Sequence, residues 1–485
     1  MGNPEVYRPK NHVRFVTASS LFDGHDASIN IMRRIIQASG AEVIHLGHNR
    51  SVEEVVNAAI QEDVQGIAIS SYQGGHVEYF KYMYDLLKER GASHIRIYGG
   101  GGGVIIPKEI KELHEYGIAR IFSPEDGRQN GLQGMINVML EECDFPTFSA
   151  EVSEQIEDLQ NGNVNAVARL ITLAEHHVSA DKEAAAALDT VMEKVKSLEK
   201  QVPVLGITGT GGAGKSSLTD ELIRRFINEV PEKKVAILSV DPTKQKTGGA
   251  LLGDRIRMNS IFNPRVYMRS LATRKSKSEL SLAIRDAISV AKAAGFDLIV
   301  VETSGIGQGD AEITEICDVS MYVMTSEFGA PSQLEKIDMI DFADLIVINK
   351  FERKGSEDAK RQVQKQFQRS RMLFEKDLDE MPVYGTIASQ FNDPGTNAVF
   401  AVLLEKINEK AGTDWKTRFS KHAVVEKQNV IIPNEQRYYL REVSETVRTY
   451  HRKAEEQAEL ARKLFQLEGA ILAVKEQGEN AEVIA

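Results

Sequence analysis

Short apolar runs alternate with amphipathic segments along the first part of this chain. The runs have strand length, whereas residues 27–39 and 77–90 carry apolar side chains at helical spacing. Strands that alternate with helices predict a parallel, doubly wound sheet of the flavodoxin type, so we expect an α/β domain over residues 1–145. The expected strands are residues 12–19, 42–47, 66–71, 95–100 and 118–123.

A second series of strands and helices begins after Pro203. Its strands are almost continuously apolar, as expected where helices cover both faces of a sheet, so residues 203–415 predict a second α/β domain. Residues 146–202 are rich in Ala, Glu and Lys, and they predict either a helical connector or a packed helical subdomain. The expected strands are residues 204–208, 234–240, 297–303, 320–326, 345–349 and 383–388.

The last part of the chain, residues 416–485, is expected to be a helical linker. Residues 434–465 predict one long helix with an apolar stripe and charged residues elsewhere. Such a stripe needs an apolar partner, in this chain or in another. The stripe comprises Leu440, Val443, Val447, Tyr450, Ala454, Ala461 and Leu464.

Composition restricts the class of protein. An apolar content of 42% and a charged content of 27% are ordinary for a soluble globular chain, and a net charge of -11 argues against nucleic-acid binding. The two cysteines, Cys143 and Cys317, are far apart and predict no disulfide framework. Residues 1–14 are polar, unlike a secretory signal, and no apolar run has the length of a membrane span. We expect a cytoplasmic protein that binds no membrane.

Polar residues and glycines follow the strands of the first domain. His25 comes directly after the first strand, at the carboxyl edge where doubly wound sheets bind ligands, and Asp23 can fix its tautomer for metal ligation. Taken singly, an Asp-x-His pair is usually a surface polar pair and a glycine run is a turn; the spacing between segments favours a site. The candidate residues are Asp23, Gly24, His25, Asp26, Ser70, Tyr72, Gly99 and Gly100.

This arrangement resembles the cobalamin-binding domain shared by B12-dependent mutases and methionine synthase. The resemblance implies that His25 is the lower cobalt ligand and Asp23 its hydrogen-bond partner. It also implies that Ser70 bonds the displaced nucleotide tail and that Gly99 and Gly100 make room for it. Ser28 stands where the family has Gly, and Tyr72 where it has Leu, so we expect a tighter tail pocket.

A complete P-loop sequence opens the second domain, after the strand 204–208 and before the helix 215–226. Its backbone amides and the helix N-terminus suit phosphates, Lys215 suits the β- and γ-phosphates, and Ser216 suits Mg²⁺. The candidate nucleotide-binding residues here are Gly209, Gly211, Gly212, Ala213, Gly214, Lys215, Ser216 and Ser217.

Acidic residues at neighbouring strand ends predict a magnesium site. A single one could merely cap a helix or turn, but several beside a P-loop favour metal binding. The candidate magnesium ligands are Asp241, Asp254, Glu302 and Thr303 together with Ser216.

A further motif resembles the guanine-reading Asn-Lys-x-Asp of G proteins. It comprises Asn349, Lys350 and Glu352, with Glu in place of Asp. A longer carboxylate still accepts hydrogen bonds from guanine, so we expect GTP rather than ATP. Ser389 is a candidate backbone contact to the base.

The runs 241–257 and 301–308 resemble the MeaB-type GTPase chaperones of B12 mutases, a class that nickel-enzyme GTPases share more widely. The resemblance suggests Arg257 as a nucleotide contact and Lys215 and Glu302 as catalytic residues. It places Gln308 and residues 326–336 in switch segments. Gln308 could orient the attacking water or simply be a surface glutamine.

A cobalamin domain followed by this GTPase domain resembles the front half of the fused isobutyryl-CoA mutase family. The resemblance implies that the protein binds adenosylcobalamin, Mg²⁺ and GTP, and that it takes part in a radical interconversion of isobutyryl-CoA and n-butyryl-CoA. It also implies a GTPase that gates cofactor loading and repair, and a homodimeric assembly. No substrate barrel follows residues 434–465, so we expect this chain to bind cobalamin and hydrolyse GTP, and to isomerise acyl-CoA only with a barrel in a longer chain or a separate subunit.

Two alternatives from other classes remain. One is a corrinoid carrier or B12-dependent sensor with a nucleotide switch and no mutase activity. The other is a metallochaperone for a metal such as nickel, which would need Cys and His clusters; the two distant cysteines argue against it.

Overall fold

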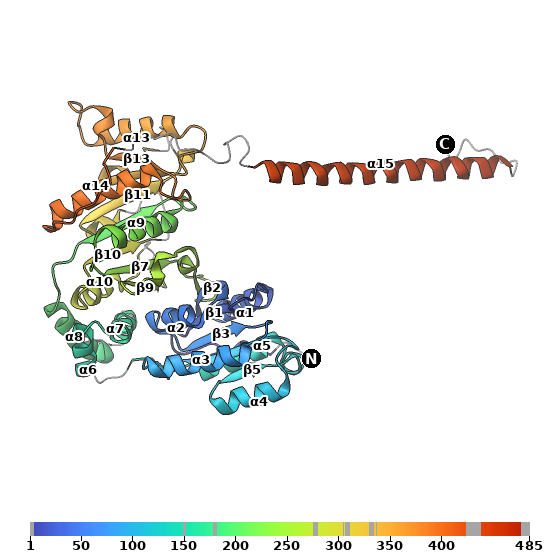
Figure 1. The fold of residues 1–485 in the computed structure, drawn as a ribbon, viewed down its shortest axis with the longest axis horizontal. Coiled ribbons are helices and arrows are strands. Elements are labelled where there is room, and N and C mark those ends of the chain that lie inside the picture. The colour runs from blue at the N-terminus through green and yellow to red at the C-terminus, as the bar shows by residue number, and fades with distance from the viewer. Residues whose placement is uncertain are drawn as a thin grey trace. The chain divides into compact units, whose positions relative to one another are not determined.

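The computed structural model describes residues 4–148, 152–177, 182–274, 280–303, 305, 311–328, 334–335, 337–422 and 438–476. The chain divides into two units, Met1–Ala423 and Val424–Ala485. The first unit holds two parallel sheets, and the second is described separately below (Figure 1).

The first sheet has the strand order β5-β4-β3-β1-β2-β8, and every pairing in it is parallel. The strand at its centre, β1, is buried along its whole length, and apolar clusters lie on both faces of the sheet. The predicted doubly wound α/β class is confirmed. The elements before residue 145 are β1 (Arg14–Ser20), α1 (Ala27–Ala38), β2 (Glu42–Arg50), α2 (Val52–Gln61), β3 (Gly66–Ser70), α3 (His76–Glu89), β4 (Arg96–Gly100), α4 (Pro107–Tyr116), β5 (Arg120–Phe122) and α5 (Pro124–Glu142).

Three helices follow the first sheet: α6 (Val152–Gln160), α7 (Val164–His177) and α8 (Lys182–Ser197). Apolar side chains of α7, such as Leu170 and Ile171, are buried in one cluster with strands of the second sheet. Helix α7 is therefore packed into the same core as the second sheet, and residues 146–202 remain a helical connector or a packed helical subdomain as predicted.

The second sheet has the order β13-β12-β11-β6-β10-β7-β9 and is also parallel. Its strand β9 was not expected from the sequence. The strands are β6 (Val204–Gly209), β7 (Val235–Asp241), β9 (Val266–Ala272), β10 (Leu298–Glu302), β11 (Val319–Met324), β12 (Leu345–Asn349) and β13 (Val383–Thr386). The helices and short 3₁₀ turns are α9 (Lys215–Glu229), η1 (Asp254–Arg257), η2 (Ser260–Phe262), α10 (Ile284–Ala293), η3 (Glu312–Glu315), η4 (Ser326–Phe328), α12 (Met339–Phe342), α13 (Ser356–Ser370), η5 (Leu378–Glu380) and α14 (Pro394–Ala411).

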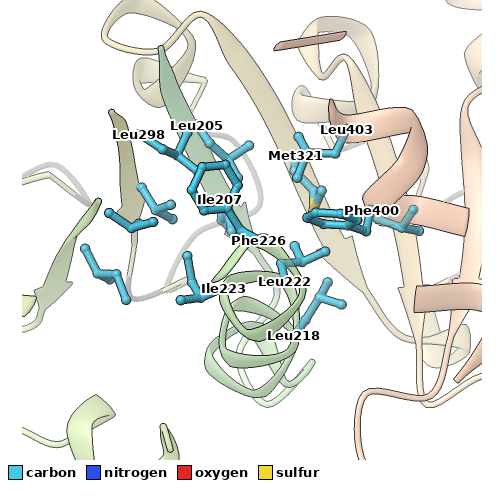
Figure 2. Close-up of a cluster of buried hydrophobic side chains, with 14 of the residues drawn as sticks. Leu205, Ile207, Leu218, Leu222, Ile223, Phe226, Leu298, Met321, Phe400 and Leu403 are labelled. Carbon is cyan, nitrogen blue, oxygen red and sulfur yellow. The ribbon is translucent and has the colours of Figure 1, made fainter. Parts of the chain in front are cut away.

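Helix α9 is held against the second sheet by a continuous apolar cluster (Figure 2). Leu222 and Phe226 on the helix pack with Leu205 and Ile207 on β6 and with Phe400 on α14. Full burial of such a side chain contributes about 1.5–3 kcal/mol. This packing fixes the N-terminus of α9 at the carboxyl end of β6.

One strand of the first sheet comes from the second half of the chain. Strand β8 (Ala250–Leu252) pairs in parallel with β2, with Ala250 opposite Glu42 and Leu252 opposite Ile44. The close approach needs glycine beforehand, because a Cβ on Gly249 would lie 2.1 Å from the carbonyl oxygen of Gln37. The segment between β7 and β9 of the second sheet therefore supplies an edge strand to the first sheet, in addition to side-chain contacts.

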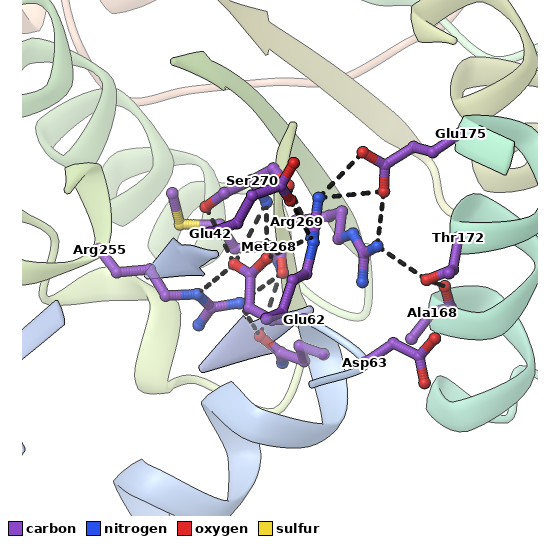
Figure 3. Close-up of polar contacts among 12 residues, drawn as sticks. Glu42, Glu62, Asp63, Ala168, Thr172, Glu175, Arg255, Met268, Arg269 and Ser270 are labelled. Carbon is purple, nitrogen blue, oxygen red and sulfur yellow. Dashed lines mark hydrogen bonds and ion pairs between the residues drawn. The ribbon is translucent and has the colours of Figure 1, made fainter. Parts of the chain in front are cut away.

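A buried network of ion pairs lies between the two sheets and α7 (Figure 3). Arg255 lies 2.7 Å from Glu62, and Arg269 lies 2.7 Å from Glu175 (Figure 3). The Arg14 guanidinium reaches Glu175 at 2.9 Å. Because each charge is almost fully buried and paired, removing one partner would leave the other uncompensated.

The second unit contains the helix α15 (Tyr439–Glu476), which has no buried residue. It extends beyond the predicted end at residue 465, since residues 466–476 are mostly good helix formers with a single glycine. Residues 434–437 of the prediction lie outside the described residues. Among the helices that the structure describes, none is both long and apolar enough to cross a membrane.

Candidate functional site

The loop after β1 holds His25 on a buried carboxylate. Asp23 has no exposed surface, and its Oδ1 accepts hydrogen bonds from the His25 backbone N–H and from His25 Nδ1, each at 2.9 Å. Its Oδ2 accepts from the Tyr72 backbone N–H at 2.6 Å. The His25 side chain is 69% exposed. Because Nδ1 is bound to Asp23, Nε2 is the nitrogen left to face a ligand.

A cavity of about 310 Å³ opens beside this loop, between α1 and α5 and over the carboxyl ends of β3 and β4. Ser70, Tyr72, Gly99 and Gly100 line it, as does Ser28, whose hydroxyl lies 2.6 Å from Tyr72 Oη. The two residues that depart from the family pattern thus bond each other. Ser70 Oγ lies 2.9 Å from Ser19 Oγ, a residue not singled out in the sequence.

Glycine is required at two of three successive positions beside the cavity, Gly99 and Gly101. A Cβ on Gly99 would lie 2.4 Å from Phe80, and one on Gly101 would lie 1.9 Å from the Ser71 carbonyl oxygen. A Cβ on Gly100 would make only ordinary contacts. The glycine run therefore lets β4 pack tightly against its own core as well as leaving the cavity open.

The P-loop wraps the N-terminus of α9. Lys215 Nζ donates to the carbonyl oxygens of Gly209 and Thr210 at 3.1 and 3.3 Å. Gly214 precedes the helix with φ 88°, a left-handed conformation that favours glycine. Backbone N–H groups at this end of the helix form an anion-binding site.

Carboxyl groups crowd around Ser216, whose Oγ lies 2.7 Å from Glu302 Oε1 and 3.1 Å from Asp254 Oδ1. Burial raises the pKa of Asp241 to about 8 and that of Glu302 to about 7, and the nearby Asp254 raises both. Asp241 Oδ2 is buried without a hydrogen-bond partner among the described residues. This crowding of negative charge is relieved by a cation.

Asn349 connects the P-loop to the far side of the nucleotide site. Its Nδ2 donates to the Ala213 carbonyl at 2.8 Å, and its Oδ1 accepts from the Ala388 N–H at 3.1 Å. Lys350 Nζ donates to the Gly212 carbonyl at 2.7 Å, whereas Glu352 and Ser389 are exposed. The Asn-Lys motif thus lies against the P-loop, as a base-reading segment would.

The remaining predicted residues have mixed placements. Thr303 is buried and donates to Thr208 Oγ1 at 2.8 Å. Arg257 is exposed, and its positive charge acts to lower the pKa of Asp241. Gln308 and parts of the loop 326–336 lie outside the described residues. Sequence reasoning missed Ser239, which donates to Asp254 Oδ2; its place next to the end of β7 was the available signal.

Family models match two parts of the chain. The family described as methylmalonyl-CoA mutase-associated GTPase MeaB matches residues 167–472. The chain belongs to the MeaB family. The B12-binding domain family matches residues 13–127, which contain the Asp23–His25 pair and most of the cavity. This MeaB-family chain therefore joins a B12-binding domain to its GTPase domain.

Its curated relatives carry the same two parts in longer chains. A protein of Geobacillus kaustophilus named fused isobutyryl-CoA mutase is 79% identical over 99% of this chain and 44% of its own length. A protein of the same name from Cupriavidus metallidurans is 57% identical over 95% of this chain and 42% of its own. The chain thus spans less than half the length of these relatives. A solved LAO/AO transport system kinase covers 70% of this chain and 96% of its own, at 22% identity and a TM-score of 0.41.

Proposed function

We propose that this MeaB-family chain is the adenosylcobalamin-binding and GTP-hydrolysing part of an acyl-CoA mutase, and that its GTPase gates loading and repair of the cofactor. The observation that carries this proposal is the presence of both sites in one compact unit: an Asp23-bound His25 beside a cavity, and a P-loop whose Ser216 lies beside two carboxyl groups, those of Asp254 and Glu302.

His25 and the cavity suit a cobalamin whose lower base is displaced. Nε2 of His25 would hold the cobalt, Asp23 would fix the imidazole, and the cavity over β3 and β4 would take the nucleotide tail. When bound, adenosylcobalamin supplies the radical chemistry that the mutases require. The resemblance to fused isobutyryl-CoA mutases makes the isobutyryl-CoA and n-butyryl-CoA interconversion the proposed reaction, on a barrel in cis or in a partner subunit, with a homodimer as the assembly.

The carboxyl groups around Ser216 suit Mg²⁺ bound with GTP. No three His, Cys, Asp or Glu side chains of the described residues form a metal site by themselves. Mg²⁺ commonly takes only one or two carboxylates and completes its shell with phosphate oxygens and waters. Ser216, with Asp241, Asp254 and Glu302 around it, would hold the ion, and Lys215 would neutralise charge on the phosphates.

The proposal is tested by two measurements on the purified chain. GTP hydrolysis should require Mg²⁺ and be lost in Lys215→Ala, with the exposed Lys376→Ala as the matched control. Adenosylcobalamin should give a base-off, His-on visible spectrum that disappears in His25→Ala but persists in the exposed His48→Ala. Hydrolysis retained in Lys215→Ala would overturn the assignment of the P-loop, and no cobalamin binding by the folded chain would overturn the mutase assignment. Tight GTP binding with negligible turnover would favour the corrinoid carrier or sensor.

A further inference from the structure

The segment of residues 250–257, here called the bridging segment, contacts both the first sheet and the nucleotide site. It starts as β8, which pairs with β2 of the first sheet, and ends as η1, which carries Asp254 at the P-loop. A nucleotide site does not by itself require a neighbouring strand such as β8 to pair with the sheet of another domain. One short segment of backbone therefore connects the nucleotide site to the first sheet.

At the nucleotide end, Asp254 is held by two hydroxyls. Ser216 Oγ lies 3.1 Å from its Oδ1 and 2.7 Å from Glu302 Oε1, and Ser239 Oγ donates to Asp254 Oδ2. Ser216 is also the residue that faces a nucleotide-bound cation in a P-loop. A cation bound there would engage the Ser216 oxygen, and the contact between Ser216 and Asp254 would then change.

Two residues of η1, next to Asp254, contact the first sheet. Arg255 is buried, and its Nε lies 2.7 Å from Glu62 at the end of α2. Ile256 packs directly on the backbone of β2, because a Cβ on Gly47 would lie only 2.9 Å from Ile256 Cδ1. Gly47 has φ 84° and lies at an irregular register between β1 and β2.

The same end of β2 holds the loop that carries His25. Two residues after Gly47, the Asn49 backbone N–H donates to the Asp23 carbonyl at 3.3 Å, and Asn49 Oδ1 accepts from the Phe22 N–H at 2.8 Å. Phe22 and Asn49 both have positive φ, 64° and 56°, which is a strained conformation for a non-glycine residue. The His25 loop therefore depends on the position of β2 at Gly47.

We propose that the bridging segment couples the two sites, so that nucleotide at Ser216 changes cobalamin affinity at His25 through Asp254, Ile256, Gly47 and Asn49. The inference rests on the proposed function and names the residues through which gating works. Coupling between binding sites is reciprocal, so cobalamin must change the affinity for nucleotide by the same factor.

The test measures the dissociation constant of adenosylcobalamin, from its visible spectrum, with and without a saturating non-hydrolysable GTP analogue and Mg²⁺. Nucleotide affinity is measured with and without cobalamin. We expect the wild-type chain to show the same ratio in both directions, about 5-fold or more. Ile256→Ala should bring the ratio close to one while each ligand still binds alone. Asn49→Gly, which permits the positive φ but removes the bond to Phe22, should do the same.

Ile106→Ala is the matched control, because Ile256 and Ile106 have similar exposure, 40% and 49%, and Ile106 directly precedes α4, outside the path. Its ratio should equal that of the wild type. A wild-type chain that binds both ligands with a ratio of one would overturn the coupling but leave the assignment of the cobalamin and GTP sites intact. An unchanged ratio in both Ile256→Ala and Asn49→Gly would overturn this path. Failure of the wild-type chain to bind either ligand would overturn the proposed function, and the inference with it.

Discussion

Removal of the Glu62 carboxylate should weaken the packing between the two sheets of the first unit. Glu62 is fully buried at the end of α2, and its oxygens accept from Arg255 Nε at 2.7 Å and from the Ser270 N–H at 3.0 Å. Arg14 also lies within 3.5 Å. In Glu62→Ala, the guanidinium of Arg255 keeps its charge but loses its counter-ion in a region without access to water.

The cost of this loss can be estimated from burial. Removing one partner of a buried ion pair costs about 3–5 kcal/mol. Deleting Glu112, whose side chain is 47% exposed in a pair with Lys81, should cost only about 0.2–1 kcal/mol. At about 2–4 °C per kcal/mol for a domain of this size, Glu62→Ala should lower the first thermal midpoint by on the order of 10 °C.

The assay is thermal unfolding followed by near-ultraviolet circular dichroism, with Glu112→Ala as the control. Because a multidomain chain need not unfold in one step, the first midpoint is compared rather than a single free energy. Glu62→Gln, which keeps the volume and one acceptor oxygen, should fall between the wild type and Glu62→Ala. Equal shifts for Glu62→Ala and Glu112→Ala would refute the reasoning that the buried network holds the sheets together.

Three further perturbations test local features. Gly101→Ala should weaken cobalamin binding at least about tenfold, a cost of about 1.4 kcal/mol, because its Cβ would lie 1.9 Å from the Ser71 carbonyl oxygen. Gly103→Ala is the control, because its Cβ would meet nothing within 4 Å. Equal dissociation constants for the two variants in spectral titrations would contradict this prediction. Asn349→Ala leaves the Ala388 N–H without its acceptor, which costs about 1–3 kcal/mol. The dissociation constant for GTP, measured by calorimetry, should therefore rise roughly tenfold. Burial lowers the pKa of His45 to about 4 from its ordinary 6.5, so between these pH values the unfolded chain binds a proton that the folded chain does not. The free energy of unfolding should therefore fall as the pH drops from about 6.5 toward 4, and it should fall less in His45→Gln.

Much of the candidate chemistry is local in sequence and was therefore predictable. The P-loop is a contiguous run whose glycines, Lys215 and Ser216 act within one strand–loop–helix unit, and the structure places them around the start of α9. Asp23 and His25 are two residues apart on one loop, so their contact needed no knowledge of distant segments. The roles of these residues remain predictions, to be tested as described above.

Contacts between distant segments were decided only by the tertiary structure. Strand β8 is three residues long and was not expected, because its partner β2 lies some two hundred positions earlier in the chain and parallel pairing leaves no mark on the local pattern. Arg255 and Glu62 are ordinary charged residues in the sequence and become a buried pair only when the two sheets meet. The sequence by itself determined the two α/β series and the local motifs, since periodicity and short motifs depend on neighbouring residues. How the nucleotide site is joined to the His25 loop depends on packing between residues far apart in the chain, and only the folded structure reveals it.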